Sequence, residues 1–99
     1  MKYKINTSEQ FDKWFGKLKD IKAKARITLR LRQVSTGHFG DHKLVSNNLY
    51  ELRFFFGSGY RVYYTIQNNQ IVILLSGGDK VSQSKDIAKA KKLLLELES

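Results

Sequence analysis

The first apolar positions of the chain recur at the spacing of a helix. They stand at i, i+3, i+4 and i+7 and so share one helical face: Phe11, Trp14, Phe15 and Leu18. Thr7 or Ser8 can cap this helix, and the segment 2–5 before it reads as a short strand. We expect the aromatic face to belong to the core.

A second helix is expected from Asp20 to about Val34. Five residues form its expected apolar arc: Ile21, Ala25, Leu29, Ile27 and Leu31. Four cations are expected together on the other side: Lys19, Lys22, Arg26 and Arg30. Such a stripe is usually a solvated face. Here no acids are interleaved, so the four cations repel one another, and a bound anion would relieve that repulsion. Arg26 and Arg30 are therefore candidate ligand-binding residues.

The apolar period changes to two after the segment 35–48, which reads as a loop because it holds Gly, His, Asp and Asn. Segments 49–56 and 60–67 alternate like antiparallel strands around the turn 57–59, and 71–75 is continuously apolar like a central strand. One side of the hairpin is expected to be buried: Tyr50, Leu52, Val62 and Tyr64.

A last helix is expected over about 84–97, which completes the order β-α-α-β-β-β-α. This order predicts an α+β fold in which two N-terminal helices pack on a mostly antiparallel sheet with a C-terminal helix. No proline, low-complexity linker or repeat marks a boundary, so a single domain over 1–99 is expected.

The charge of the chain narrows its partners. Eighteen Lys and Arg against nine Asp and Glu give a net charge of +9. The charge is unevenly distributed, since the stretch 17–32 holds seven basic residues and one acid. A domain this basic indicates nucleic acid or an acidic protein as the partner. The alternative is a general solubilising excess of charge.

Several classes of protein can be set aside. There is no cysteine, and two histidines are too few to indicate a zinc site, so neither a metal nor a cofactor is expected. No stretch approaches 18 apolar residues and the N-terminus lacks an apolar leader, so we expect a cytoplasmic protein without a membrane segment.

Two arginines are expected to share the second face of the hairpin and to lie outside. A three-residue turn over 57–59 makes Arg53 and Arg61 diagonal neighbours. Two planar guanidinium groups within reach of one anion suit phosphate recognition. Tyr63 and Phe55 on the same face could stack on unpaired bases. The alternative is that both arginines are solvent-facing residues of a one-sided sheet.

The segment 76–86, "SGGDKVSQSKD", lies between the last strand and the last helix. It has neither the Walker spacing nor the G-x-G-x-x-G spacing. Its glycines could still let backbone amides approach an anion, and Lys80 adds a charge. Most turns of this composition only turn the chain. Asp79 is expected to anchor the turn rather than to bind a metal.

Three stretches together carry a resemblance: "ARITLRLRQVSTGHFGDHKLV", "YELRFFFGSGYRVYY" and "LLSGGDKVSQSKDIAKAKKL". The chain resembles the RelE/ParE toxin superfamily over most of residues 11–95, and more narrowly its HigB-like "addiction module killer protein" group. The family fold agrees with the element order derived above. Ser58 stands where a proline is common, and Glu51 where RelE-type members often carry a lysine.

The resemblance implies the toxin of a type II toxin–antitoxin system, a metal-independent endoribonuclease that cuts mRNA, often on the ribosome. Its implied partner is a cognate antitoxin, expected to be a helix-turn-helix protein. An acidic or amphipathic antitoxin segment would cover the basic groove or displace the last helix. The alternatives are a ParE-like poison of DNA gyrase without catalysis, and a non-catalytic RNA-binding domain.

Metal-free RNA cleavage needs a base for the ribose 2′-hydroxyl, cations for the phosphorane and an acid for the leaving oxygen. The expected catalytic residues are the cations Arg53, Arg61 and Lys80 and, by the resemblance, Asp86 as general base or orienting group. The expected substrate-binding residues are Lys43, Tyr63, Arg26 and Arg30. His38 and His42 suit acid–base chemistry by residue type but are expected to be bystanders.

Overall fold

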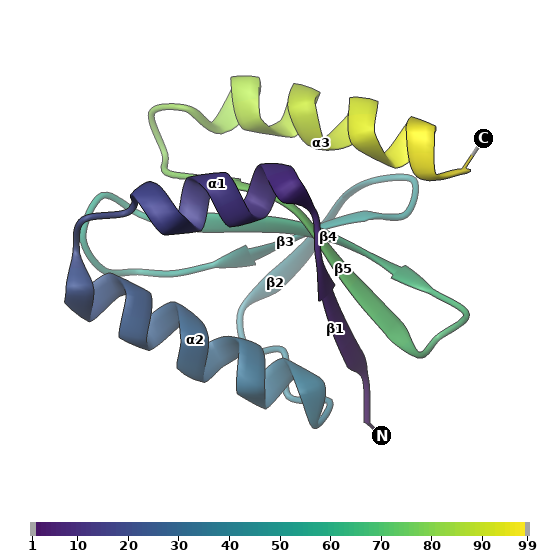
Figure 1. Cartoon of the computed structure of the whole chain (residues 1–99), viewed down its shortest axis with the longest axis horizontal. Coiled ribbons are helices and arrows are strands. Elements are labelled where there is room, and N and C mark those ends of the chain that lie inside the picture. Colours follow the sequence, from purple (N-terminus) through teal and green to yellow (C-terminus); the bar gives the residue numbers. More distant parts are fainter. Residues whose placement is uncertain (1, 99) are drawn as a thin grey trace.

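The computed structural model describes residues 2–98, in which three helices accompany a five-stranded sheet of order β1-β5-β4-β3-β2 (Figure 1). The elements are β1 Lys4–Thr7, α1 Glu9–Lys17, α2 Ile21–Ser35, β2 His42–Ser46, β3 Leu49–Arg53, β4 Arg61–Gln67, β5 Ile71–Gly78 and α3 Gln83–Glu98. β1 pairs with β5 in parallel, and the other neighbours are antiparallel. The predicted α+β class is confirmed.

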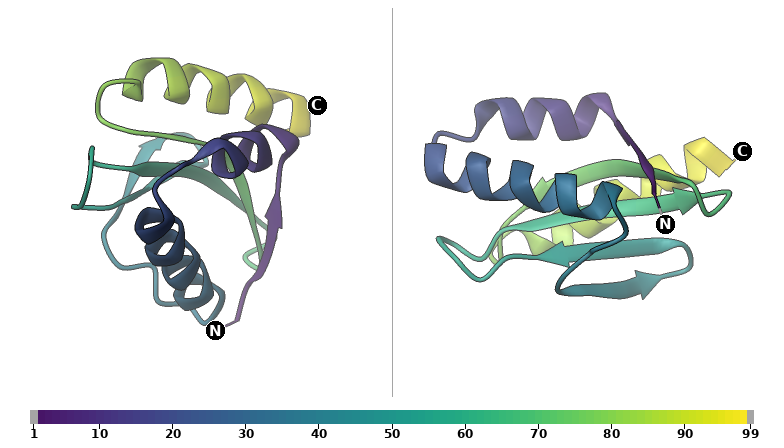
Figure 2. Two further views of the ribbon diagram at one scale, coloured as in Figure 1. Left: turned by 60° about the vertical axis from the view of Figure 1, so that its left-hand side comes forward. Right: turned by 90° about the horizontal axis from the view of Figure 1, so that it is seen from below.

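The sheet is covered on both faces (Figure 2). α1 and α2 bury Phe11 and Ile27 against one face, which includes the expected core residues Leu52 and Val62. α3 packs its Ala90 and Leu94 on the other face, against Leu49, Tyr63 and Leu75. The alternative of a one-sided sheet is therefore wrong, because the last helix takes the face that the first two leave open.

Helix α2 faces the sheet with only part of the expected apolar arc: Ile27 is buried and Leu31 packs against the core. Ala23, Ile27 and Val34 are buried, whereas Ile21 is 80% and Leu29 is 54% exposed. At about 100° per residue the two stripes lie on roughly opposite sides of the helix, so only one can face the core. The helix starts as expected, with the Asp20 side chain accepting from the backbone N–H of Ala23.

The loop of the central hairpin is longer than predicted. β3 ends at Arg53 instead of residue 56, and the backbone N–H of Phe54 donates to the Tyr60 carbonyl at 3.0 Å. Arg53 consequently lies directly opposite Arg61 instead of diagonal to it. The run of three phenylalanines concealed the place where alternation stops, because Phe54 buries its ring in the core beyond the strand.

The segment 35–48 is not all loop, since β2 forms the edge of the sheet within it. His42, Lys43 and Leu44 are all exposed, so this strand lacks an apolar alternation. β5 likewise runs beyond the expected 71–75, through both glycines of the next loop. Among the helices of residues 2–98, none has the length and apolar character needed to span a membrane.

Candidate active site

One end of the sheet gathers most of the predicted site residues beneath the first turn of α3. Arg53 pairs with Arg61 across β3 and β4, and Arg61 pairs with Gly78 across β4 and β5. Directly paired residues project to the same face of a sheet. A neighbouring row on this face runs through Lys43, Glu51, Tyr63 and Ser76. We call the two rows the site floor.

Arg61 is buried, with 7% of its surface exposed, where an exposed arginine was expected. One terminal nitrogen of its guanidinium donates to the carbonyls of Gly59 and Tyr60, at 3.1 and 3.2 Å. Its Nε has no hydrogen-bond partner among residues 2–98. The burial leaves one charged donor without an acceptor in the described part of the chain.

The loop after β5 brings Lys80 to the hairpin, as the sequence predicted. The methylenes of Lys80 lie across Gly59, where an alanine Cβ would approach them to 2.9 Å. Asp79 anchors the turn by accepting from the backbone N–H groups of Val81 and Ser82, at 2.9 and 3.2 Å. These bonds, that of Ser82 first, lower the pKa of Asp79. Lys80 is exposed, so its ammonium group can meet a ligand at the edge of the floor.

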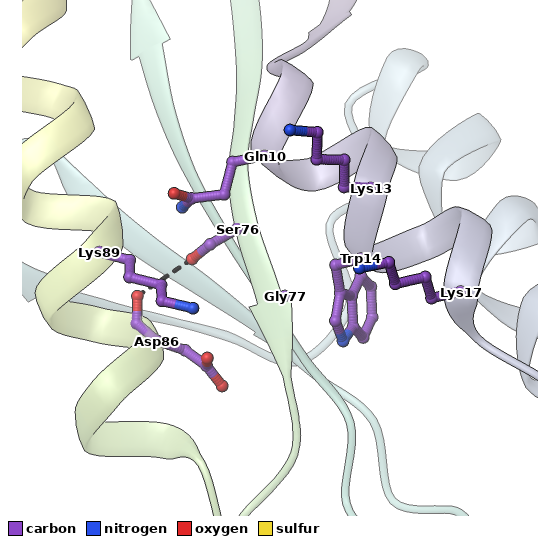
Figure 3. Close-up of a pocket in the computed structure, with 8 residues that line it drawn as sticks. All are labelled: Gln10, Lys13, Trp14, Lys17, Ser76, Gly77, Asp86 and Lys89. Carbon is purple, nitrogen blue, oxygen red and sulfur yellow. Dashed lines mark hydrogen bonds between the residues drawn. The ribbon is translucent and has the colours of Figure 1, made fainter.

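Asp86 lies in the first turn of α3 and is also buried. Its carboxylate fills the space that a side chain at Gly78 would occupy, and it accepts a hydrogen bond from the Ser82 hydroxyl. The Ser76 hydroxyl donates to the Asp86 backbone carbonyl at 3.1 Å (Figure 3). The amino end of a helix favours a negative charge, so the first turn of α3 is a favourable place for this carboxylate.

Arg53 is engaged by a residue that the sequence analysis did not single out. Its guanidinium donates to both carboxylate oxygens of Asp41, at 3.0 and 3.1 Å. The hydrogen bond to Asp41 raises the pKa of Arg53 above its usual value. Arg53 is therefore in an ion pair and not the free cation that was expected, because the edge strand β2 places Asp41 beside β3.

Tyr63 cannot stack on a base, because α3 buries it completely. Its hydroxyl has no hydrogen-bond partner among residues 2–98. Burial first, and then the charges of Glu51 and Asp86, raise the pKa of Tyr63, while Arg61 opposes them. The phenol is consequently a neutral donor and not a base. Glu51 is itself buried, and Gln83 of α3 lies 3.5 Å from it, a contact that the sequence analysis missed.

The remaining predicted substrate-binding residues do not form one group. Arg30 lies over the Phe54 ring at 4.5 Å and donates to the carbonyls of Phe39 and Arg53, so it acts as a structural brace. Arg26 is exposed, with its guanidinium over the Phe56 ring at 4.9 Å. Both lie on the α2 side of the sheet. Only Lys43 lies on the site floor, at its exposed edge.

This geometry joins a carboxylate, a buried guanidinium and an exposed ammonium group: Asp86, Arg61 and Lys80. Such a set can remove a proton from a hydroxyl and stabilise negative charge that develops on a phosphate. Among residues 2–98, no group of three or more His, Asp or Glu side chains is placed to hold a metal ion.

Comparisons with known proteins agree with the fold. An uncharacterised protein of Haemophilus influenzae is 50% identical over 97 residues, 98% of each chain. The Escherichia coli toxin RelE, as a free mutant, has a TM-score of 0.76 at 23% identity, over 93% of this chain and 97% of that one. The intact E. coli RelBE toxin–antitoxin complex gives 0.63 at 21% identity, over 78% and 95%.

Family membership rests on the sequence match. Residues 13–95 match the family described as phage derived protein Gp49-like (DUF891). The resemblance to the RelE/ParE superfamily is confirmed at the level of the fold, whereas the narrower HigB-like group stays a prediction. The chain therefore belongs to the Gp49-like family of phage-derived proteins and has a RelE-type fold.

Proposed function

We propose that this chain is the toxin of a type II toxin–antitoxin pair and an endoribonuclease that cleaves messenger RNA. The observation that carries the proposal is the meeting of Arg61, Lys80 and Asp86 at one end of a RelE-type sheet. The net charge of +9 suits an RNA substrate. Cleavage on the ribosome is a refinement of the same proposal.

The proposed reaction uses these side chains in order. Asp86 accepts the proton of a ribose 2′-hydroxyl, whose oxygen attacks the adjacent phosphorus. The bond to the 5′-oxygen breaks, which leaves a 2′,3′-cyclic phosphate and a 5′-oxygen that takes a proton from solvent. Lys80, which is exposed, stabilises the charge on the non-bridging oxygens, and the buried guanidinium of Arg61 adds to the positive potential there.

The test is induced expression in bacteria, followed by growth curves and primer extension on cellular mRNA. Lys80→Gln and Asp86→Asn keep side-chain size and should abolish growth arrest and cleavage. Lys91→Gln, on an exposed part of α3, is the matched control. Arg61→Ala is less informative, because Arg61 is buried and its loss also affects folding.

Three outcomes would overturn the proposal. If Lys80→Gln and Asp86→Asn remain folded and fully toxic, the nuclease site is elsewhere. If the wild-type chain arrests growth without cutting RNA, a supercoiling assay with purified gyrase tests the poison alternative. RNA binding without either effect would leave a non-catalytic RNA-binding domain.

We also propose that an antitoxin docks on the second apolar stripe of α2. Ile21, Ala25 and Leu29 are exposed and line a groove of about 500 Å³ with Phe15 of α1. Lys24 and Arg32 also line the groove, so the complementary partner is an acidic amphipathic helix. The same pattern of apolar anchors and surrounding charge governs helix-in-groove recognition.

Two substitutions on this stripe test the docking. The double variant Ile21→Ser, Leu29→Ser should weaken binding of the protein encoded by the neighbouring reading frame, and leave RNA cleavage and melting temperature unchanged. Equal binding by the variant would place the antitoxin elsewhere. If a second copy of the chain occupies this stripe instead of an antitoxin, light scattering of the chain alone would detect a dimer.

A further inference from the structure

A second cavity includes Asp86 in its lining. Its volume is about 310 Å³, and α1, β5 and α3 supply its lining (Figure 3). The lining residues are Gln10, Lys13, Trp14, Lys17, Ser76, Gly77, Asp86 and Lys89. We call it the edge cavity.

The edge cavity exists because β1 is too short to cover β5. β1 pairs with β5 only as far as Leu74, and the chain then turns away into α1. Ser8 and Gln10 each donate to the Leu75 carbonyl, which fixes the start of α1 at this point. The last residues of β5 therefore lie at an open edge, between a helix on one face and a helix on the other.

The lining residues suit an anionic ligand and include one aromatic side chain. Three lysines from two helices and one carboxylate are among the residues that line the cavity. In Figure 3 the side chains of Lys17 and Lys89 extend toward β5 from opposite helices. Lys13 pairs with Glu9 at 3.3 Å, but both side chains are largely exposed, so this pair exchanges readily. Trp14 supplies an aromatic surface against the backbone of Gly77.

We propose that the edge cavity binds a nucleotide of single-stranded RNA next to the bond that Asp86 acts on. The lysines would hold its phosphate, and the indole of Trp14 would contact its base, as aromatic side chains do in single-strand binding sites. The amide of Gln10 and the hydroxyl of Ser76 offer polar partners for the base or ribose. This inference rests on the proposed function, because it gives the RNA a path past the reacting group.

Trp14 makes the test specific, because it is the only tryptophan of the chain. A short 2′-O-methyl RNA lacks the attacking hydroxyl, so it can be titrated into the wild-type protein without cleavage. Its binding should quench the tryptophan emission to saturation. The double variant Lys17→Gln, Lys89→Gln should weaken this binding about tenfold and lower its salt slope by about 0.7 per lysine.

The matched control is Lys22→Gln, Lys91→Gln, which removes two exposed lysines outside the edge cavity and should change affinity less than about twofold. RNA that binds by anisotropy without quenching would refute the inference and leave the nuclease proposal standing. Quenching by polyglutamate but not by RNA would assign the cavity to an acidic protein. A chain that neither binds nor cuts RNA would remove both proposals.

Discussion

Gly77→Ala should destabilise the protein because the added methyl group has no space. An alanine Cβ at this position would lie 2.6 Å from Cδ2 of Trp14 and overlap its six-membered ring. The indole cannot easily move away, since it packs against the rings of Phe11 and Tyr60 at centroid distances of 5.8 and 6.5 Å. The strain is therefore steric and falls on a rigid neighbour.

Overpacking of this kind typically costs about 1–3 kcal/mol. For a domain of this size, each kcal/mol lowers the melting temperature by about 4–8 °C, so a fall of roughly 5–20 °C is expected. Gly16→Ala is the matched control. Its Cβ would meet nothing within 4 Å in α1, so it should stabilise the protein by about 0.5 kcal/mol.

Thermal unfolding followed by circular dichroism measures both variants, and tryptophan emission reports the environment of the indole. The Gly77→Ala emission should shift, because Trp14 must tilt out of its contact with β5. If Gly77→Ala melts with the wild type and emits at the same wavelength, then Trp14 does not lie against β5 and the wall of the edge cavity is wrongly described.

Three further predictions concern the charged and phenolic groups. Asp41→Ala should free Arg53 to bind RNA, which should steepen the salt slope of RNA binding by about 0.7, measured by anisotropy; an unchanged slope would exclude contact. Burial raises the pKa values of Tyr63 and Tyr64, so above about pH 10 only the unfolded state loses these protons. Stability should then fall by up to about 1.4 kcal/mol per pH unit for each tyrosine, measured by urea unfolding, and Tyr63→Phe should lessen the slope. Lys80→Gln should slow cleavage of a purified RNA by about 10²–10³ with an unchanged melting temperature; an unchanged rate would remove Lys80 from the site.

Local patterns in the sequence predicted the elements that they control directly. The helical spacing around Phe11 and the alternation around Leu52 and Val62 identified residues that are buried. Asp20 was identified as a helix start, and its side chain does accept a backbone hydrogen bond. Capping and periodicity act over a few residues, so a single sequence contains the information that determines them.

Choices between two faces were not in the sequence. α2 carries one apolar stripe through Ile27 and another through Ile21 and Leu29, and only tertiary packing selects the buried one. The face that α3 covers is equally a matter of packing, and it decides that Tyr63 is buried. Alternation places such residues together on a face without showing what covers that face.

The position of Lys80 depends on chain order, whereas that of Asp41 depends on an unpatterned strand. Lys80 follows β5 directly, and β5 pairs with β4, so its approach to Gly59 of the hairpin turn could be inferred. The pairing of Asp41 with Arg53 depends on β2, whose exposed residues show no period. Polar edge strands carry little hydrophobic signal, so their partners are found only in the structure.

The pairing of β1 with β5 also sets the timing of folding during synthesis. β1 is the first part of the sheet to be made, yet its partners in β5 are among the last, and Ser8 bonds to a carbonyl 67 positions later. Contacts between such distant parts of a chain form late. A growing chain that has not reached β5 holds α1 with the otherwise buried ring of Phe11 uncovered. The unfinished protein thus offers a chaperone or a waiting partner an aromatic surface that the finished protein conceals.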